Sequence, residues 1–136
     1  MKVAFDTNVL ISAYSARGLS ADVFRYVLAE HDVLLSERVL SEFERVLTER
    51  FGIPAAMVSD FLEELRLHEV VGDVTVSPDL DVIRDPDDRM VVAAALQGKA
   101  DVLVTGDKDI LEVRDYIAKL TAMTPRAFWE SVRTSD

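Results

Sequence analysis

Short apolar runs alternate along this chain with longer segments in which apolar residues recur every three or four positions. Short continuous runs predict buried strands, whereas the longer spacing predicts amphipathic helices. The predicted strands are Val3–Phe5, Val33–Leu35, Val70–Val76, Asp101–Thr105 and Lys119–Met123. The first of these runs ends at an aspartate, Asp6.

Helices are predicted between the strands. Ser20 is the expected N-cap of the second helix, and Gly98 is expected to stop the helix with the most apolar face. The predicted helices are Thr7–Ala16, one that starts after Ser20, Glu37–Arg50, Pro54–Glu69, Met90–Leu96, Asp107–Arg114 and one that starts at Pro125. Residues 77–88 are predicted to be a loop.

Strands that alternate with helices, and that are apolar throughout, are typical of a sheet covered on both faces. The prediction is a single α/β domain over residues 1–136, with a mainly parallel five-stranded sheet and helices on both faces. In such sheets ligands bind outside the carboxyl ends of the strands. The residues at those ends are therefore the first candidates for function.

Two strands end in an aspartate at this edge. Asp6 follows Val3–Phe5, and Asp107 follows Asp101–Thr105 after one glycine. If the two strands are neighbours, the carboxylates lie close together, and a proton or a cation must relieve their repulsion. Each aspartate could instead simply cap the helix that follows it.

Two further acids are candidates on helices. Glu42 lies at the edge of the apolar stripe of its helix, where a carboxylate needs a partner or a metal. Asp88 stands just before the apolar helix, although Asp85 or Asp87 could fill the same role, and Asp109 could share that of Asp107. An acidic first turn also stabilises a helix without any further function.

Composition narrows the chemistry. The chain has no cysteine and two histidines, His31 and His68, which lie at predicted helix ends away from these acids. Ligation by oxygen alone favours Mg²⁺ or Mn²⁺ over zinc. Such ions commonly act on phosphate esters. The formal charge of −10 argues against nucleic-acid binding, although bound cations would offset part of it.

No apolar run approaches the 18 residues of a membrane span, and strand-like sequence from Lys2 leaves no room for a signal peptide. A cytoplasmic protein is therefore expected.

Four motifs resemble those of PIN-domain nucleases and occur in the same order along the chain. They are most similar to the motifs of the VapC-like toxins of toxin–antitoxin systems. The motifs are Asp6-Thr-Asn-Val-Leu10, Ser36-Glu-Arg-Val-Leu-Ser-Glu42, Asp85-Pro-Asp-Asp88 and Thr105-Gly-Asp-Lys-Asp109. The resemblance implies a Mg²⁺- or Mn²⁺-dependent endoribonuclease, frequent homodimers and often a neutralising antitoxin. It implies that the metal-site acids are Asp6, Glu42, Asp88 and Asp107, with Asn8 and Thr105 orienting them.

Three basic residues flank these acids and are expected to contact RNA phosphates: Arg17, Arg89 and Lys108. The unit from Glu37 to Glu69 has a long apolar face, part of which is expected to pack against a second subunit or an antitoxin helix.

Two other functions remain open. One is a haloacid-dehalogenase-like phosphatase, although Asn8 stands where that class needs a second acid. The other is a non-catalytic scaffold that binds RNA or protein.

Overall fold

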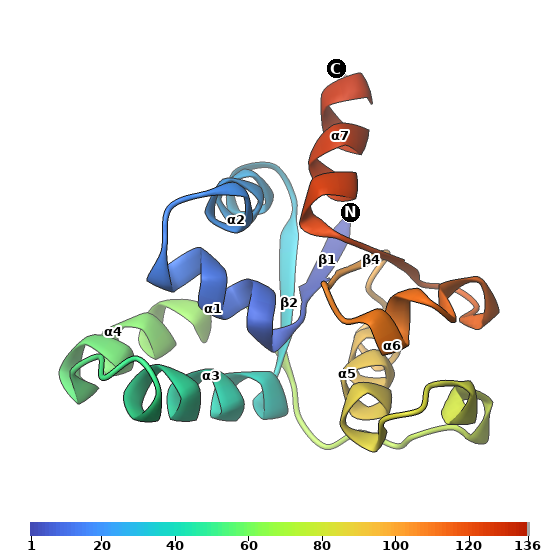
Figure 1. Ribbon diagram of the computed structural model, residues 1–136, viewed down its shortest axis with the longest axis horizontal. Helices are drawn as coiled ribbons and strands as arrows, with labels where there is room; N and C mark the ends of the chain where they lie inside the picture. The colour runs from blue at the N-terminus through green and yellow to red at the C-terminus, as the bar shows by residue number, and fades with distance from the viewer. Residues whose placement is uncertain (136) are drawn as a thin grey trace.

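The computed structural model describes residues 1–135, the side chain of residue 135 excepted. Strands and helices alternate along almost the whole chain (Figure 1). The elements are β1 (Lys2–Phe5), α1 (Thr7–Ser15), α2 (Leu19–Glu30), β2 (Asp32–Ser36), α3 (Glu37–Glu49), α4 (Ala55–Leu65), β3 (Glu69–Val71), η1 (Pro78–Val82), α5 (Pro86–Gln97), β4 (Val102–Val104), α6 (Lys108–Leu111), η2 (Arg114–Tyr116), β5 (Thr121–Met123) and α7 (Pro125–Ser135).

The sheet has five strands in the order β3-β2-β1-β4-β5, and all four pairings are parallel. From β1 the chain first moves outward through β2 to β3, and then crosses back to the other side of β1 to form β4 and β5. The connections therefore leave β1 in opposite directions, which makes the carboxyl ends of β1 and β4 the topological switch point of the sheet.

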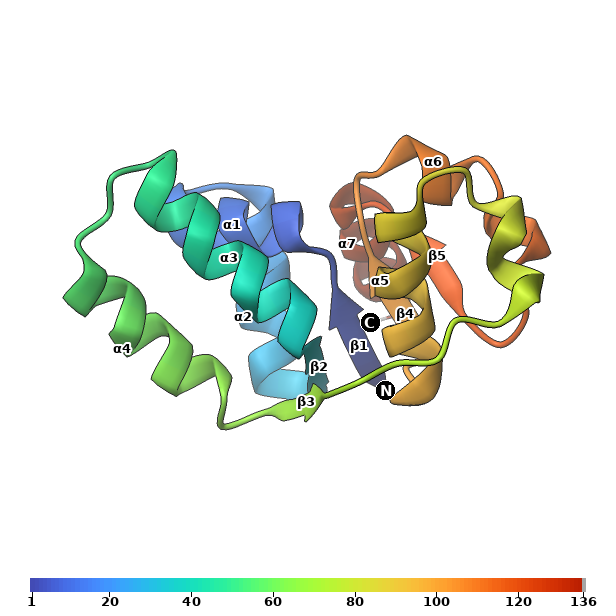
Figure 2. The ribbon, with the colours of Figure 1, turned by 90° about the horizontal axis from the view of Figure 1, so that it is seen from below.

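The core has two layers, because successive side chains of each strand point to opposite faces of the sheet. Val3 and Phe5 of β1 pack with α1–α4 and α7, whereas Ala4 between them packs with α5 and α6. The two layers are visible on opposite sides of the sheet when the molecule is seen from below (Figure 2). The predicted α/β fold, with a parallel five-stranded sheet and helices on both faces, is confirmed.

Gly98 has a packing role that the sequence did not reveal. A Cβ atom at this position would lie only 2.5 Å from Leu34 Cδ2 and 3.0 Å from Val71 Cγ2. The left-handed residue that ends α5 is instead Lys99, with φ at 60°. A glycine is needed at position 98 because α5 lies so close to β2 and β3.

Three local predictions were wrong. Gly18, not Ser20, is the N-cap of α2. The third strand ends at Val71, because Val74 and Val76 pack against the core without pairing with the sheet. The loop predicted over residues 77–88 contains η1 and the first turn of α5.

Candidate metal centre at the carboxyl ends of β1 and β4

Asp6 is the first residue after β1 and is almost fully buried, with 8% of its surface exposed. Its backbone N–H donates to the Val104 carbonyl at 3.0 Å, which continues the pairing of β1 with β4. One carboxylate oxygen accepts from the Thr7 N–H at 2.7 Å and thereby caps α1. The other accepts from the Thr105 hydroxyl at 2.6 Å. Asp6 therefore serves as a helix cap and also faces the end of β4.

Thr105 links the two strand ends. It is fully buried, and its Oγ1 accepts from the Asp107 N–H at 3.0 Å while donating to Asp6. Asp107 in turn caps α6 by accepting from the Asp109 N–H at 2.8 Å. The carboxylates that follow β1 and β4 are thus held in one hydrogen-bonded arrangement.

Asp88 contributes a further carboxyl group from the first turn of α5, inside the helix and not before it as predicted. Burial, the negative charge of Asp107 and a hydrogen bond between the two groups raise the pKa of Asp88 to about 7. The negative charges of Asp85 and Asp6 contribute to the same rise. Burial and the neighbouring acids therefore both favour the protonated form of Asp88.

The pKa of Asp6 is also raised. Burial is the main cause, and the negative charges of Asp107 and Glu42 add to it, while hydrogen bonds from Thr105 and Thr7 oppose it. Glu42, half-buried on α3, is therefore near enough to act electrostatically on Asp6. Electrostatic interactions therefore connect the four acids expected at the site, which come from the ends of β1 and β4, from α3 and from α5. Among the described residues, the carboxylate oxygens close enough to share one cation belong instead to Asp85, Asp88 and Asp109.

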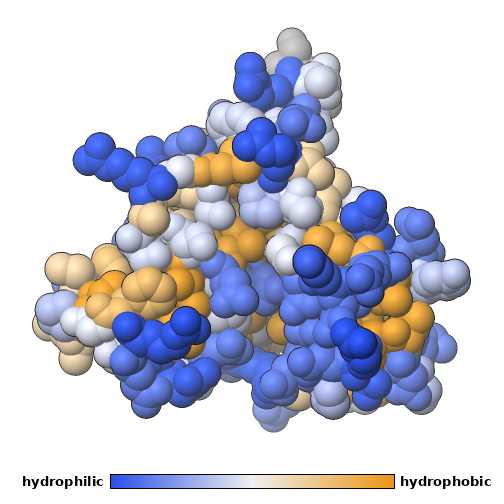
Figure 3. All heavy atoms as spheres, in the orientation of Figure 1, coloured by the Kyte–Doolittle hydropathy of each residue, from blue (hydrophilic) through white to orange (hydrophobic). Residues whose placement is uncertain are grey.

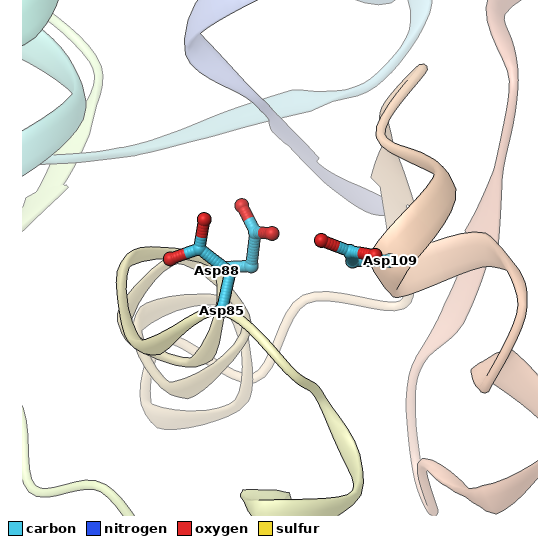
Figure 4. Close-up of side chains that lie close together, drawn as sticks. All are labelled: Asp85, Asp88 and Asp109. Carbon is cyan, nitrogen blue, oxygen red and sulfur yellow. The ribbon is translucent and has the colours of Figure 1, made fainter.

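Asp85 and Asp109 lie beside this group. One carboxylate oxygen each from Asp85, Asp88 and Asp109 lies within 4.8 Å of the others. The three side chains face the same space between α5 and α6 (Figure 4). Arg84 balances part of this charge through an ion pair of 2.7 Å with Asp109.

Asp87 is directed elsewhere. Although it lies next to Asp88, its carboxylate forms an ion pair with Arg38 of α3. Asp85 is the N-cap of α5, accepting from the Asp87 N–H at 2.8 Å. Of the three neighbouring aspartates, Asp88 is therefore the one that interacts most strongly with the strand-end acids.

The residues expected to contact substrate differ in their freedom to do so. Arg17, between α1 and α2, and Lys108, at the start of α6, are exposed. The Arg89 guanidinium is instead engaged with backbone carbonyls, at 2.6 Å from Ile83 and 3.4 Å from Arg84. Asn8 is exposed in the first turn of α1.

Thr7 was not among the residues expected at the site. Its hydroxyl is buried beside Asp6 without a hydrogen-bond partner in the described part of the chain. Its position next to Asp6 in the motif Asp6-Thr-Asn-Val-Leu10 is the feature of the sequence that could have indicated a role.

The donor set suits a hard divalent cation, because the clustered groups offer carboxylate oxygen and neither nitrogen nor sulfur. His31 lies with its Nδ1 atom 3.2 Å from the N-terminal nitrogen, beside the ring of Tyr26. His68 precedes β3 and so lies toward the opposite edge of the sheet. Two carboxyl groups with raised pKa values are what a bound cation would return to the ionised state.

Fold and site together define a class: α/β proteins with an acidic centre at the switch point of a parallel sheet. A family model described as PIN domain matches residues 2–109, and the chain belongs to the PIN-domain family. An uncharacterized protein of Methanocaldococcus jannaschii is 30% identical over 120 residues, which cover 85% of this chain and 76% of that protein.

Two solved structures share the fold. One is the VapBC2 complex from Rickettsia felis bound to a promoter DNA fragment, with a TM-score of 0.60 and 13% identity over 91% of this chain and 98% of that one. The other is a toxin–antitoxin complex from Klebsiella pneumoniae, with a TM-score of 0.62 and 18% identity over 90% and 97% of the respective chains.

Proposed function

We propose that this protein is a Mg²⁺- or Mn²⁺-dependent endoribonuclease. The observation that carries the proposal is the arrangement in which Thr105 joins Asp6 to the backbone of Asp107, with Asp88 sharing a hydrogen bond with Asp107. Membership of the PIN-domain family also supports a nuclease function.

In this proposal Asp6, Glu42, Asp88 and Asp107 hold the cation. When bound, the cation would make a water molecule more acidic, orient the phosphodiester and stabilise the departing oxygen. Thr105 fixes the orientation of Asp6 by its hydrogen bond, as groups behind metal ligands commonly do. Exposed Lys108 stands beside Asp107 and would help to stabilise the departing 3′-oxygen. The products would carry 5′-phosphate and 3′-hydroxyl ends.

The proposal extends to a toxin that acts in the cytoplasm and is neutralised by an antitoxin. Of the two solved structures with the same fold, one is described as a toxin–antitoxin complex and the other as VapBC2 bound to DNA from its promoter. Residues 1–135 include no helix long and apolar enough to cross a membrane.

An apolar surface is available for a homodimer or an antitoxin. Met57 of α4 and Phe51, which precedes it, are about half exposed, and Leu67 is 83% exposed. Apolar side chains gather over α4 and α1 on the face seen in Figure 3. These side chains fit the surface expected on the unit from Glu37 to Glu69.

The test is cleavage of an end-labelled single-stranded RNA with Mn²⁺, with Mg²⁺ and with EDTA. The proposed nuclease cleaves only with the cation, and Asp107→Asn abolishes cleavage. The matched control is Asp22→Asn, which removes the same charge from an exposed position on α2. Products that end in a 2′,3′-cyclic phosphate, in a reaction unaffected by EDTA, would contradict the mechanism.

Calorimetric titration with Mn²⁺ separates the enzyme from a scaffold. A scaffold that only binds RNA or protein needs no cation, whereas the proposed enzyme binds Mn²⁺ and loses that binding in Asp107→Asn.

A further inference from the structure

A groove leads to the acidic centre from the side of α3. It has a volume of about 500 Å³ and lies between the exposed face of α3 and the first turn of α5. Its lining residues are Glu37, Arg38, Ser41, Glu42, Arg45 and Asp87. Glu42, which lines the groove, also acts electrostatically on Asp6, so the groove and the acidic centre share this residue. The surface between the start of α3 and α5 is mostly hydrophilic (Figure 3).

The two arginines of the groove share a helix face with Glu42. Residues four and seven positions apart lie on the same side of a helix, so Arg38, Glu42 and Arg45 form one row. With a rise of 1.5 Å per residue, the two arginines are about 10 Å apart along α3. A chain that followed this row would meet a cation on each side of Glu42.

The negative charges of the groove do not cancel this pattern. Glu37 is engaged by Arg66 from α4 through two hydrogen bonds of 2.7 and 3.0 Å. Glu42 belongs to the acidic centre, where a divalent cation would neutralise it. The remaining acid of the groove is Asp87. Its carboxylate forms an ion pair with Arg38 and is directed away from the acidic centre.

The pair of Arg38 with Asp87 is easily exchanged. The Arg38 side chain is 40% exposed and that of Asp87 is 73% exposed. Exposed ion pairs contribute at most about 1 kcal/mol, because water screens them. A phosphate group can bind guanidinium through two parallel hydrogen bonds, so it is a strong competitor for Arg38.

Two other arginines near the centre are less available. Arg84 is bound to Asp109, whose side chain is only 24% exposed and which lies among the clustered acids. Arg89 is engaged with backbone carbonyls that hold the loop before α5. Arg45 pairs with Glu49 of its own helix, also at an exposed position, so Arg38 and Arg45 are the arginines of the groove whose partners are exposed.

We propose that this groove is the path of the RNA backbone, and that Arg38 binds a phosphodiester next to the one cleaved, displacing Asp87. Arg45 contacts the chain further along α3. The inference rests on the proposed ribonuclease function and adds the direction from which single-stranded RNA reaches the acids. Arg38 is a substrate-binding residue here and does not touch the reacting atoms.

The test compares Arg38→Gln with Arg25→Gln, which removes the same charge from an exposed position on α2. Binding of a short fluorescent single-stranded RNA is measured by anisotropy with Ca²⁺ in place of Mn²⁺, at several salt concentrations. Arg38→Gln weakens binding about tenfold. It also lowers the slope of log affinity against log salt by about 0.7, the value for one lost phosphate contact on a single strand. Arg25→Gln changes neither quantity.

Two further variants give effects of opposite sign. Asp87→Asn frees Arg38 and tightens binding, whereas Arg38→Lys keeps the charge, loses the paired hydrogen bonds and falls between the parent and Arg38→Gln. With Mn²⁺, Arg38→Gln raises KM about tenfold and leaves kcat within about threefold of the parent.

The outcomes separate this inference from the function on which it rests. If the parent cleaves RNA and Arg38→Gln keeps the parent's affinity and salt slope, the proposed path is wrong and the ribonuclease proposal stands. A loss of kcat without a change in affinity would likewise overturn it, as would a loss of cleavage in Asp87→Asn. If the parent neither binds nor cleaves RNA, both proposals fail. Thermal unfolding of each variant establishes that it is folded.

Discussion

Charged residues have different kinds of partner at the two ends of the strands, called here the amino edge and the carboxyl edge of the sheet. At the amino edge, Lys2 forms an ion pair of 2.9 Å with Glu69 and donates to the Gly98 carbonyl at 2.8 Å. The Lys2 backbone N–H donates to an Asp101 carboxylate oxygen at 2.8 Å. At the carboxyl edge, Asp6 and Asp107 are joined through Thr105, and the nearest charged neighbours include further acids.

The difference shows where the sheet is built for stability and where it is not. At the amino edge, Glu69 has a cation as its partner and Asp101 accepts a hydrogen bond. At the carboxyl edge, burial and neighbouring acids raise the pKa values of Asp6 and Asp88, so the charge of these two groups opposes folding until a cation binds. Crowding of like charges at a switch point is a cost that marks a binding site.

The largest expected difference between the two edges is in RNA cleavage after one charge is removed at each. Asp6→Asn should lower RNA cleavage by at least about a hundredfold, because it removes a proposed cation ligand. It should not lower the melting temperature in EDTA, since asparagine also caps helices and the change relieves repulsion. Asp101→Asn, the same substitution at the amino edge, keeps an oxygen to accept from Lys2 and should leave cleavage unchanged. Melting temperatures in EDTA and cleavage rates in Mn²⁺ check both. A strongly destabilised Asp6→Asn would show that Asp6 is chiefly a structural cap.

A smaller effect is expected from the bridge between the strand ends. Thr105→Val keeps the shape of the side chain but removes the hydrogen bond to Asp6 and the acceptor for the Asp107 N–H. Cleavage should fall about 10- to 100-fold, and the free energy of unfolding by about 1–3 kcal/mol.

Thr124, which follows the neighbouring strand β5, provides the control: Thr124→Val removes a hydrogen bond of 3.0 Å from the Ala127 N–H at the start of α7 and leaves the bond between Thr105 and Asp6 in place. It should cost about 1 kcal/mol of stability and no activity. Chemical denaturation and cleavage assays test the pair. Equal activity loss in both variants would mean that Thr105 acts only through stability.

The smallest effect concerns pH. The pKa of Asp88 is about 7 in the folded protein against an ordinary value of 3.8, so folding favours its protonated form. Without divalent cations, its contribution to stability is fully present below about pH 4 and is lost as the pH rises to about 7. The pKa of Glu37, paired with Arg66, is lowered, so its contribution has the opposite sign.

Melting temperatures in EDTA between pH 4 and 8 measure this dependence. Asp88→Asn should gain stability relative to the parent as the pH rises, and Mn²⁺ should raise the melting temperature of the parent most at neutral pH. A difference between parent and variant that does not change with pH would contradict the crowding of acids around Asp88.

Local pattern predicted the elements, the fold class and the positions of Asp6 and Asp107 at strand ends. It could not show that β1 and β4 are neighbours, because strand order depends on the connection from β3 back across β1. Nor could it separate Asp87 from Asp88, which differ by one position on a helix and so point in different directions. The sequence singled out neither Arg38 nor its groove, since the groove exists only once α5 lies beside α3.

The hydrogen bond between Thr105 and Asp6 also has a consequence for synthesis. It joins residues 99 positions apart, so the first and the last of the clustered acids are made at very different times. Chains are synthesised from the amino end, and non-local contacts form only after their second partner is present. A nascent chain that already carries Asp6, Glu42 and Asp88 still lacks β4 and Asp107. The proposed nuclease is therefore inactive on the ribosome until most of its length has emerged.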